Sequence, residues 1–235
     1  MRKHKIFAGA VVVALTFAAG ATTSAQQPDT GGLAYVDPAT VETLDVPLGA
    51  LVGSQVRVRG TLASGRPGDT VAVQRLDQRD GWVTAATTTL DRARGFVAAF
   101  RATKAGRTTI RAVLTAAAPQ TAVAAASVGR TLTVYRRVTA TWYGPGLYGR
   151  RTACGQKLTT RLLGVAHRTL PCGTRVDIYK NGRTISVPVV DRGPFRRDAS
   201  YDLTAATAKA LGVRATTTVG VLHTPSQPAS QAKRR

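Results

Sequence analysis

Few residues in the second half of this chain could carry acid–base chemistry. The acidic residues there are Asp177, Asp191, Asp198 and Asp202, and the single Glu of the chain lies far upstream at position 42. A general acid or base in this half must therefore be one of four aspartates. Asp177 falls in an expected strand at a solvated position, and Asp198 follows two arginines and suits a surface ion pair. Asp191 and Asp202 remain as candidates.

Asp191 ends the apolar run from Ile185 to Val190, directly before the turn-forming Gly193-Pro194. A carboxyl group at such a strand end, with apolar residues around it, can have a raised pKa and hold a proton for donation. The position also suits a carboxylate that accepts backbone N–H bonds in the turn or pairs with Arg192, which would lower its pKa. The sequence leaves both interpretations open.

Asp202 precedes an Ala-rich run that begins at Leu203, where it could simply cap a helix. His167 is the only His expected near a site, because His4 lies in the first few residues and His223 lies beside the C-terminal tail. His167 could orient an acid or bind a ligand hydroxyl, or it could be structural. With three His and two Cys in the whole chain, zinc-finger frameworks are excluded, and we expect no metal ion.

The two cysteines are Cys154 and Cys172. In an oxidising compartment they permit one intramolecular disulfide, which we expect here. A catalytic cysteine is the alternative, and it would need an unpaired thiol and an activating His. The glycines at 144, 146 and 149 match a dinucleotide-binding pattern, but no helical pattern follows them, so we expect no cofactor.

The elements that must position these residues are mostly strands. Arg175 to Tyr179 and Thr184 to Val190 flank Asn181-Gly182, a dipeptide that favours a two-residue hairpin turn. Pro188 indicates a sheet edge or a bulge, because it has no N–H for a ladder. A short helix is expected from Leu203 to Leu211, ended by the glycine that follows.

The first half predicts a separate domain. Val56, Val58 and Leu62 alternate with polar residues, which is the pattern of a half-buried strand. Similar runs follow at Thr70–Leu76, Trp82–Thr88, Phe96–Arg101, Thr108–Leu114 and Arg130–Tyr135. About six or seven such strands predict an immunoglobulin-like β-sandwich. The Ala-rich Thr115 to Ala126 is expected to be a loop, and no cluster for chemistry is evident in this half.

Several segments of the second half resemble one known family in their order and spacing. They are Trp142-Tyr143-Gly144, Arg151 to Gly155, AHRTLPCGT at 166–174, DRGPF at 191–195 and Tyr201-Asp202-Leu203. Together these segments resemble the rare lipoprotein A family, whose core is a six-stranded double-psi β-barrel related to those of barwin and expansins. The resemblance covers about Val138 to Val213. The chain departs from the family in showing no lipid-attachment Cys and no C-terminal peptidoglycan-binding repeat.

The resemblance implies a septal lytic transglycosylase, which cleaves peptidoglycan glycan strands at N-acetylmuramic acid and leaves 1,6-anhydro ends. One carboxyl group protonates the leaving oxygen and then, as carboxylate, assists attack by the C6 hydroxyl of the sugar. The resemblance favours Asp191 for this role and places Asp202 near the cleft, and His167 is the third catalytic candidate. The substrate-binding candidates are Trp142, Tyr143, Gly144, Thr152, Arg192, Gly193, Phe195 and Tyr201. Their aromatic rings could stack on sugars or could equally be core residues.

We therefore expect an all-β protein with two domains and one short helix. The expected order is a signal peptide (1–25), a flexible lead-in (26–50), the sandwich (51–136), the barrel (137–223) and a disordered basic tail (224–235). The signal peptide is indicated by early basic residues, by an apolar run from Ile6 to Ala19, and by the small residues Thr23-Ser24-Ala25. That run is short for a membrane span, although a retained anchor is the alternative. A secreted or cell-envelope protein, off the membrane after cleavage, is expected.

The charge of the chain suggests its partners. Lys and Arg number 33 against 12 Asp and Glu, which gives a formal charge of +21. Outside the cytoplasm such a charge attracts polyanions, although an Arg- and Ala-rich composition can also follow from genomic base composition. We expect peptidoglycan glycan strands as the partner, with anionic wall polymers second and no specific nucleic acid.

Two other functions stay open. The barrel could bind wall polysaccharide without cleaving it, as expansins are held to do. It could also be an inverting glycoside hydrolase that uses Asp191 with Asp202, which needs the two carboxyl groups about 6.5–9.5 Å apart.

Overall fold

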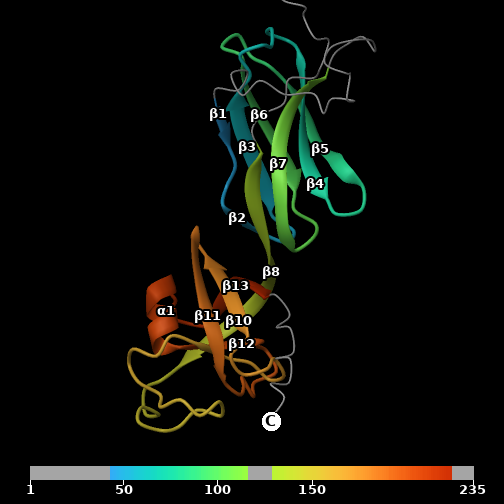
Figure 1. Cartoon of the computed structure of the whole chain (residues 1–235). Coiled ribbons are helices and arrows are strands. Elements are labelled where there is room, and N and C mark those ends of the chain that lie inside the picture. The colour runs from blue at the N-terminus through green and yellow to red at the C-terminus, as the bar shows by residue number, and fades with distance from the viewer. Residues whose placement is uncertain (1–42, 116–128, 224–235) are drawn as a thin grey trace, which may run out of the picture. The chain divides into compact units, whose positions relative to one another are not determined.

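The structure is a computed structural model that describes residues 43–115 and 129–223. These residues form a β-sandwich and a closed β-barrel, both of which include the long strand β8 (Arg130–Tyr143) (Figure 1). The predicted all-β fold with one short helix is confirmed for them. The expected signal peptide, the expected tail, and residues 116–126 of the expected Ala-rich loop lie outside the described residues.

Two sheets make the sandwich. One contains β1 (Thr43–Asp45), β3 (Gln55–Thr61) and β6 (Gly95–Arg101). The other contains β2 (Gly49–Leu51), the first part of β8, β7 (Gly106–Thr115), β4 (Thr70–Asp77) and β5 (Gly81–Thr89). The alternation in β3 works as predicted, because Val56 and Val58 are buried while Arg57 and Arg59 are exposed. All the predicted strands of this half are confirmed.

The expected flexible lead-in was too long. Leu44 in β1 and Ala50 in β2 are buried in the sandwich core. β1 pairs antiparallel with β3, and β2 pairs parallel with β8. Strands of three residues are too short to show an alternating pattern, so no periodicity in the sequence marks them.

The expected boundary between the domains, at residues 136 and 137, falls inside a strand. The first part of β8 pairs with β7, and its second part pairs with β13 (Thr217–His223) and β12 (Tyr201–Thr204). One continuous strand therefore contributes to both hydrophobic cores.

Six strands close the barrel. The ring runs through β8, β12, β9 (Val165–Ala166), β11 (Arg183–Asp191), β10 (Arg175–Lys180) and β13, which returns to β8. The pairs β8–β12 and β9–β11 are parallel, and the other pairs are antiparallel. Apolar side chains fill the inside, among them Val176, Ile178, Val187, Val189, Leu203, Val219 and Val221. This closed six-stranded barrel is consistent with the predicted double-psi fold.

The predicted hairpin is confirmed, with φ angles of 48° at Asn181 and 80° at Gly182. Pro188 does not mark a sheet edge, because β11 lies between β10 and β9. The alternative, a bulge, is present nearby as a register shift against β9 between Val189 and Asp191.

The helix α1 (Ala205–Leu211) begins two residues later than expected. Thr204, and not Asp202, is its N-cap, because the Thr204 hydroxyl accepts a hydrogen bond from the Thr207 N–H. Gly212 ends the helix in the left-handed conformation, at φ 69°. Asp202 lies in β12, so its side chain is available for another role. Among the described residues, no helix has the length and hydropathy of a membrane span.

The predicted disulfide between Cys154 and Cys172 is present. It joins the long segment between β8 and β9 to the segment between β9 and β10. The Cys154 N–H also donates to the Val190 carbonyl, so the crosslink lies against the end of β11.

Replacing both cysteines by serine should lower the free energy of unfolding by about 3 kcal/mol, because the crosslink restricts the unfolded chain. Denaturant unfolding of the two forms, followed by circular dichroism, measures the difference. An unchanged midpoint would show that other contacts hold these segments as firmly as the disulfide does.

Candidate active site

Asp191 is the last residue of β11 and connects three segments. Its Oδ1 accepts hydrogen bonds from the Ala153 and Arg192 backbone N–H groups, each at 2.8 Å. Its main-chain carbonyl accepts another from the His167 N–H at 3.1 Å. The backbone N–H bonds of the second interpretation are therefore observed, and its other form, a side-chain pair with Arg192, is not. The Arg192 guanidinium turns instead to Cys172 Sγ and to the His167 carbonyl.

Asp202 lies close to Asp191 because of the barrel topology. Ala166 in β9 is the register partner of Asp191 on one side and of Asp202 on the other. Register partners on neighbouring strands point to the same face of the sheet. Because the two aspartates are two strands apart, their Cα atoms are separated by about 10 Å. The Asp202 Oδ1 accepts a hydrogen bond from the Thr141 hydroxyl at 2.8 Å.

The surroundings of Asp202 favour its protonated form. Burial raises the pKa of Asp202, the Thr141 hydrogen bond offsets part of this, and the charge of Asp191 raises it further. The charge of Asp191 therefore affects the ionisation of Asp202, as expected for two acidic residues on one face.

The Tyr143 hydroxyl belongs to the same group. Burial and then the charge of Asp191 raise the pKa of Tyr143, and the charge of Asp202 adds to the shift. This buried hydroxyl has no hydrogen bond of ordinary geometry within the described residues, although it lies beside Asp191. A neutral donor is thus held next to the two carboxyl groups.

His167 has a clear structural task. Its Nδ1 accepts hydrogen bonds from the Thr169 and Leu170 backbone N–H groups, at 3.2 and 3.0 Å. The proton of the neutral ring is therefore on Nε2. Burial lowers the pKa of His167, and nearby charges, His223 first among them, lower it further, which favours this neutral form. His167 holds the turn that follows β9, and its backbone N–H holds Asp191.

His223 was wrongly set aside as a residue of the tail region. It ends β13 opposite Val176, near enough to His167 for their charges to interact. Burial and then the charge of Arg136 lower the pKa of His223. Nothing in the local sequence marks this residue, because the closure of the barrel brings it to His167.

The expectation that Tyr201 offers a ring to a sugar is not met. Tyr201 is 2% exposed, and its ring packs against His167 at 4.7 Å between centroids. Thr152 is also buried, at 7% exposed, and its hydroxyl bonds Gln156. Gly144 and Gly193 are buried as well, and at Gly144 a Cβ would lie 2.9 Å from Ala205 Cβ. The structure therefore places these residues in the packed surroundings of the site.

Trp142 and Phe195 are the exposed aromatic candidates, at 37% and 88%. The Trp142 Nε1 donates to the Arg214 carbonyl at 3.1 Å, which fixes the ring. The ring borders an open pocket of about 350 Å³ shared with Thr141 and Asp202, and another of about 460 Å³ shared with Tyr148. Thr141 and Tyr148 were not predicted, because they lie near Trp142-Tyr143-Gly144 without a distinctive sequence pattern of their own.

The other two aspartates are ion-paired. Asp198 binds Arg196 at 2.9 Å, as predicted for a surface pair. Asp177 binds Arg107 at 2.9 Å, so it is not simply solvated.

Comparisons with known proteins agree with the resemblance seen in the sequence. Residues 135–223 match the family model described as "Lytic transglycolase". Over 76 residues the chain is 49% identical to "Probable endolytic peptidoglycan transglycosylase RlpA" of Synechocystis sp., covering 32% of this chain and 24% of that protein. It is 46% identical over 81 residues to the protein of the same name from Aquifex aeolicus, covering 34% and 36%. It is 43% identical over 90 residues to "Endolytic peptidoglycan transglycosylase RlpA" of Pseudomonas aeruginosa, covering 37% and 26%.

All these matches fall on the barrel, so the resemblance to the rare lipoprotein A family is confirmed for this domain. The matched part spans 24% to 36% of the length of these three relatives.

The two histidines predict a loss of stability on acidification. Both have a pKa below the ordinary 6.5 in the folded protein, so the unfolded chain binds their protons more tightly. The contribution of the two histidines to the free energy of unfolding is constant above about pH 6.5, and it is lost progressively as the pH falls below that value.

The melting temperature should therefore fall between about pH 7.5 and pH 5.5, and His223→Gln should reduce the fall. Thermal unfolding by calorimetry at several pH values measures both. An equal fall in the wild type and in the variant would exclude His223 as a source.

Proposed function

We propose that this chain is a peptidoglycan lytic transglycosylase that cleaves glycan strands at N-acetylmuramic acid and leaves 1,6-anhydro ends. The observation that carries the proposal is the match of residues 135–223, the whole barrel, to the lytic transglycolase family model. The relatives named above as peptidoglycan transglycosylases support the same substrate.

The substrate lies outside the cytoplasm, so the chain is exported to the cell envelope in this proposal. The apolar run from Ile6 to Ala19 serves as the signal sequence. The Cys154–Cys172 disulfide suits the oxidising conditions of that compartment.

Asp191 is the proton-transfer residue of the proposal. Its protonated carboxyl donates to the glycosidic oxygen as the bond from C1 to that oxygen breaks. The resulting carboxylate then takes the proton of the C6 hydroxyl as its oxygen bonds to C1, and no water is consumed. The two backbone N–H bonds at Oδ1 fix the side chain and leave Oδ2 free of backbone bonds.

Asp202 supports this cycle through its charge state. Because burial and Asp191 raise the pKa of Asp202, the pair keeps a proton to higher pH than an exposed carboxyl would. The Tyr143 hydroxyl, held beside both groups, can donate to whichever carboxylate forms. His167 is a positioning residue that fixes the main chain of Asp191.

Trp142 and Phe195 bind sugar rings in the proposal. Trp142 lies between the pocket that contains Asp202 and the hollow beside Tyr148, so a strand stacked on it passes the acidic pair. Phe195 follows the Asp191 turn and exposes most of its ring.

An inverting hydrolase is the second candidate function, and the pairing of Asp191 with Asp202 about Ala166 favours it. A hydrolase adds water across the bond, whereas a lytic transglycosylase does not. The mass of the products therefore separates the two reactions.

Asp191→Asn should lower the cleavage rate by about 10²- to 10⁴-fold, because it removes the proton-transfer group at nearly constant shape. The purified chain is incubated with glycan strands stripped of stem peptides, and the products are followed by mass spectrometry. Asp198→Asn, which changes a surface ion pair, serves as the control and should keep the wild-type rate. An Asp191→Asn variant as active as wild type would exclude this assignment, and an inactive wild type would favour binding without cleavage.

Asp202→Asn and Thr141→Val should shift the pH profile in opposite directions. Asp202→Asn removes a group of raised pKa, so activity should decline at a lower pH on the alkaline side. Thr141→Val removes the hydrogen bond that lowers the pKa of Asp202, so the decline should move to a higher pH. Rates measured across pH decide the matter, and shifts in the same direction would contradict the proposed coupling.

A further inference from the structure

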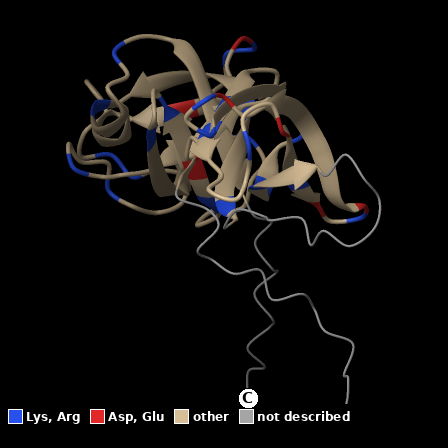
Figure 2. Cartoon of the chain, turned by 90° about the horizontal axis from the view of Figure 1, so that it is seen from above, with Lys and Arg blue, Asp and Glu red and all other residues tan. Residues whose placement is uncertain are grey.

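The sandwich carries a row of basic side chains that the proposed cleavage does not use. Lys and Arg are spread over the described residues with few Asp or Glu among them (Figure 2). On β3, Arg57 and Arg59 are exposed on one face, and Arg101 is exposed at the end of the neighbouring β6. Gln55 pairs with Arg101, so Arg101 lies diagonally from Arg57 on the same face.

Lys104 lies in the turn that follows β6, three residues after Arg101. We name Arg59, Arg57, Arg101 and Lys104 the basic strip. Successive side chains on one face of a strand lie about 6–7 Å apart, so the strip is a spaced row of charges.

The charges of the basic strip are poorly compensated. Within the described residues, Arg57, Arg59 and Lys104 form no hydrogen bond or ion pair through their side chains, and Arg101 donates only to the Gly53 carbonyl. Asp45 of β1 stands opposite Arg59 in the register. The row thus presents a net positive charge to solvent.

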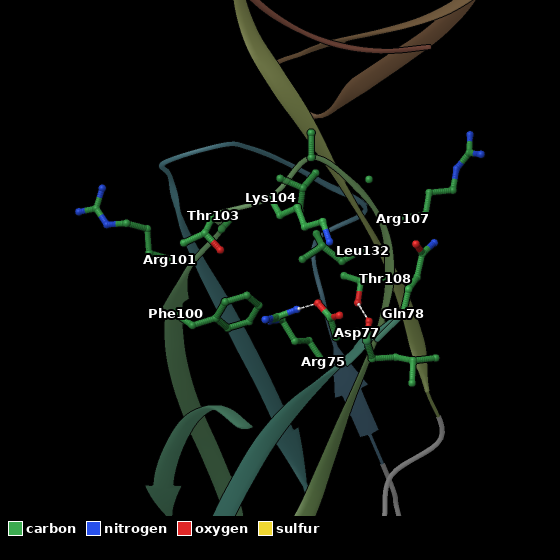
Figure 3. A pocket seen from close by; sticks show the side chains of 15 residues that line it. Arg75, Asp77, Gln78, Phe100, Arg101, Thr103, Lys104, Arg107, Thr108 and Leu132 are labelled. Carbon is green, nitrogen blue, oxygen red and sulfur yellow. Dashed lines mark hydrogen bonds and ion pairs between the residues drawn. The ribbon is translucent and has the colours of Figure 1, made fainter. Parts of the chain in front are cut away.

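A pocket of about 140 Å³ lies at the Lys104 end of the strip. The Lys104 ammonium points into this pocket, whereas Arg101 and Arg107 point away from it (Figure 3). Phe100 and Leu132 give the lining an apolar part.

The one carboxylate of this pocket is already compensated. Asp77 accepts a hydrogen bond from Arg75 at 2.8 Å and another from the Arg79 backbone N–H. These bonds, the backbone bond first, lower the pKa of Asp77 to about 2. The charge of Lys104 also contributes to this lowering, but Lys104 forms no hydrogen bond or ion pair with Asp77. Its ammonium can therefore also meet an incoming anion beside the apolar Phe100 and Leu132.

We propose that the basic strip and its pocket bind an anionic wall polymer with phosphodiester groups. Its phosphates lie along the strip, and one of its short polyol units enters the pocket. The choice of a wall polymer rests on the proposed function, which places the chain at the cell wall. The linear row of cations matches a linear polyanion.

The surface of the strip favours this occupant over two others. A single-stranded nucleic acid needs exposed aromatic rings for its bases, and the exposed aromatic side chains of the described residues, Trp142, Tyr148 and Phe195, are all in the barrel. A lipid surface needs apolar residues that insert, and Val97 is the one exposed large apolar side chain on β3 and β6.

The test measures binding of the purified chain to a synthetic poly(glycerol phosphate) oligomer. The triple variant Arg57→Gln, Arg59→Gln, Lys104→Gln removes three charges of the strip and keeps the Arg101 hydrogen bond. The matched control Arg66→Gln, Arg92→Gln, Arg130→Gln removes three exposed charges outside the strip. The strip variant should bind at least about tenfold more weakly, with a salt dependence shallower by about two to three in the logarithmic slope. The control should bind as wild type does.

Each other result overturns the proposal. Equal losses in both variants would mean attraction by net charge alone, and no loss in the strip variant would mean that the site lies elsewhere. A wild-type chain that ignores the oligomer, or that binds DNA or anionic phospholipid vesicles more tightly, would also contradict it. Melting temperatures check that both variants are folded.

Binding requires no cleavage, so this test is independent of the proposed reaction. Asp191→Asn should bind the oligomer like wild type. The strip variant should cleave glycan strands free of wall polymer at the wild-type rate. A chain that binds the oligomer through the strip but cleaves nothing would retain this inference and lose the proposed function.

Discussion

The hydrogen bonds around Asp191 join three segments of the chain at the end of β11. Much of the chain around this point is irregular. Ala153 and Arg192 donate to the side chain, and His167 donates to the carbonyl. Each donor comes from a different segment: Arg192 follows β11, His167 follows the two-residue β9, and Ala153 lies in the long segment between β8 and β9. A carboxylate that accepts several N–H bonds can replace regular pairing as the element that fixes such a junction. The disulfide and the bond from Arg192 to Cys172 reinforce the same place.

The same junction creates the electrostatics of the site. The short strand β9 lies between β11 and β12, and its residue Ala166 is the register partner of both Asp191 and Asp202. Burial and the charge of Asp191 raise the pKa of Asp202, and the buried Tyr143 hydroxyl lies beside the two carboxyl groups. A carboxyl group of raised pKa beside Asp191 suits the proposed reaction, which donates a proton and then recovers one. The fold therefore sets these charges before a ligand arrives.

Local features of the structure could be predicted from sequence, and non-local ones could not. Two of these features, the alternation in β3 and the Asn181-Gly182 turn, depend on only a few neighbouring residues. The disulfide could be predicted because two cysteines allow one intramolecular pairing. The position of His223 beside His167 depends on β13 pairing with β10 and β8, which no local pattern encodes. The Tyr201 ring is of a type that can stack on a sugar, yet alternation along β12 turns it into the core. Thr204 took the capping role because the helix begins only where β12 ends.

The coupling between Asp191 and Asp202 is tested most directly by the titration of the carboxyl carbons, followed by carbon-13 NMR in the folded protein. We expect the pKa of Asp202 to lie above the ordinary aspartate value and to fall when Asp191 is replaced by Asn, because a neighbouring negative charge is removed. A titration of Asp202 that is the same in the wild type and in Asp191→Asn would show that the two groups act independently, and the proposed shared proton would be excluded.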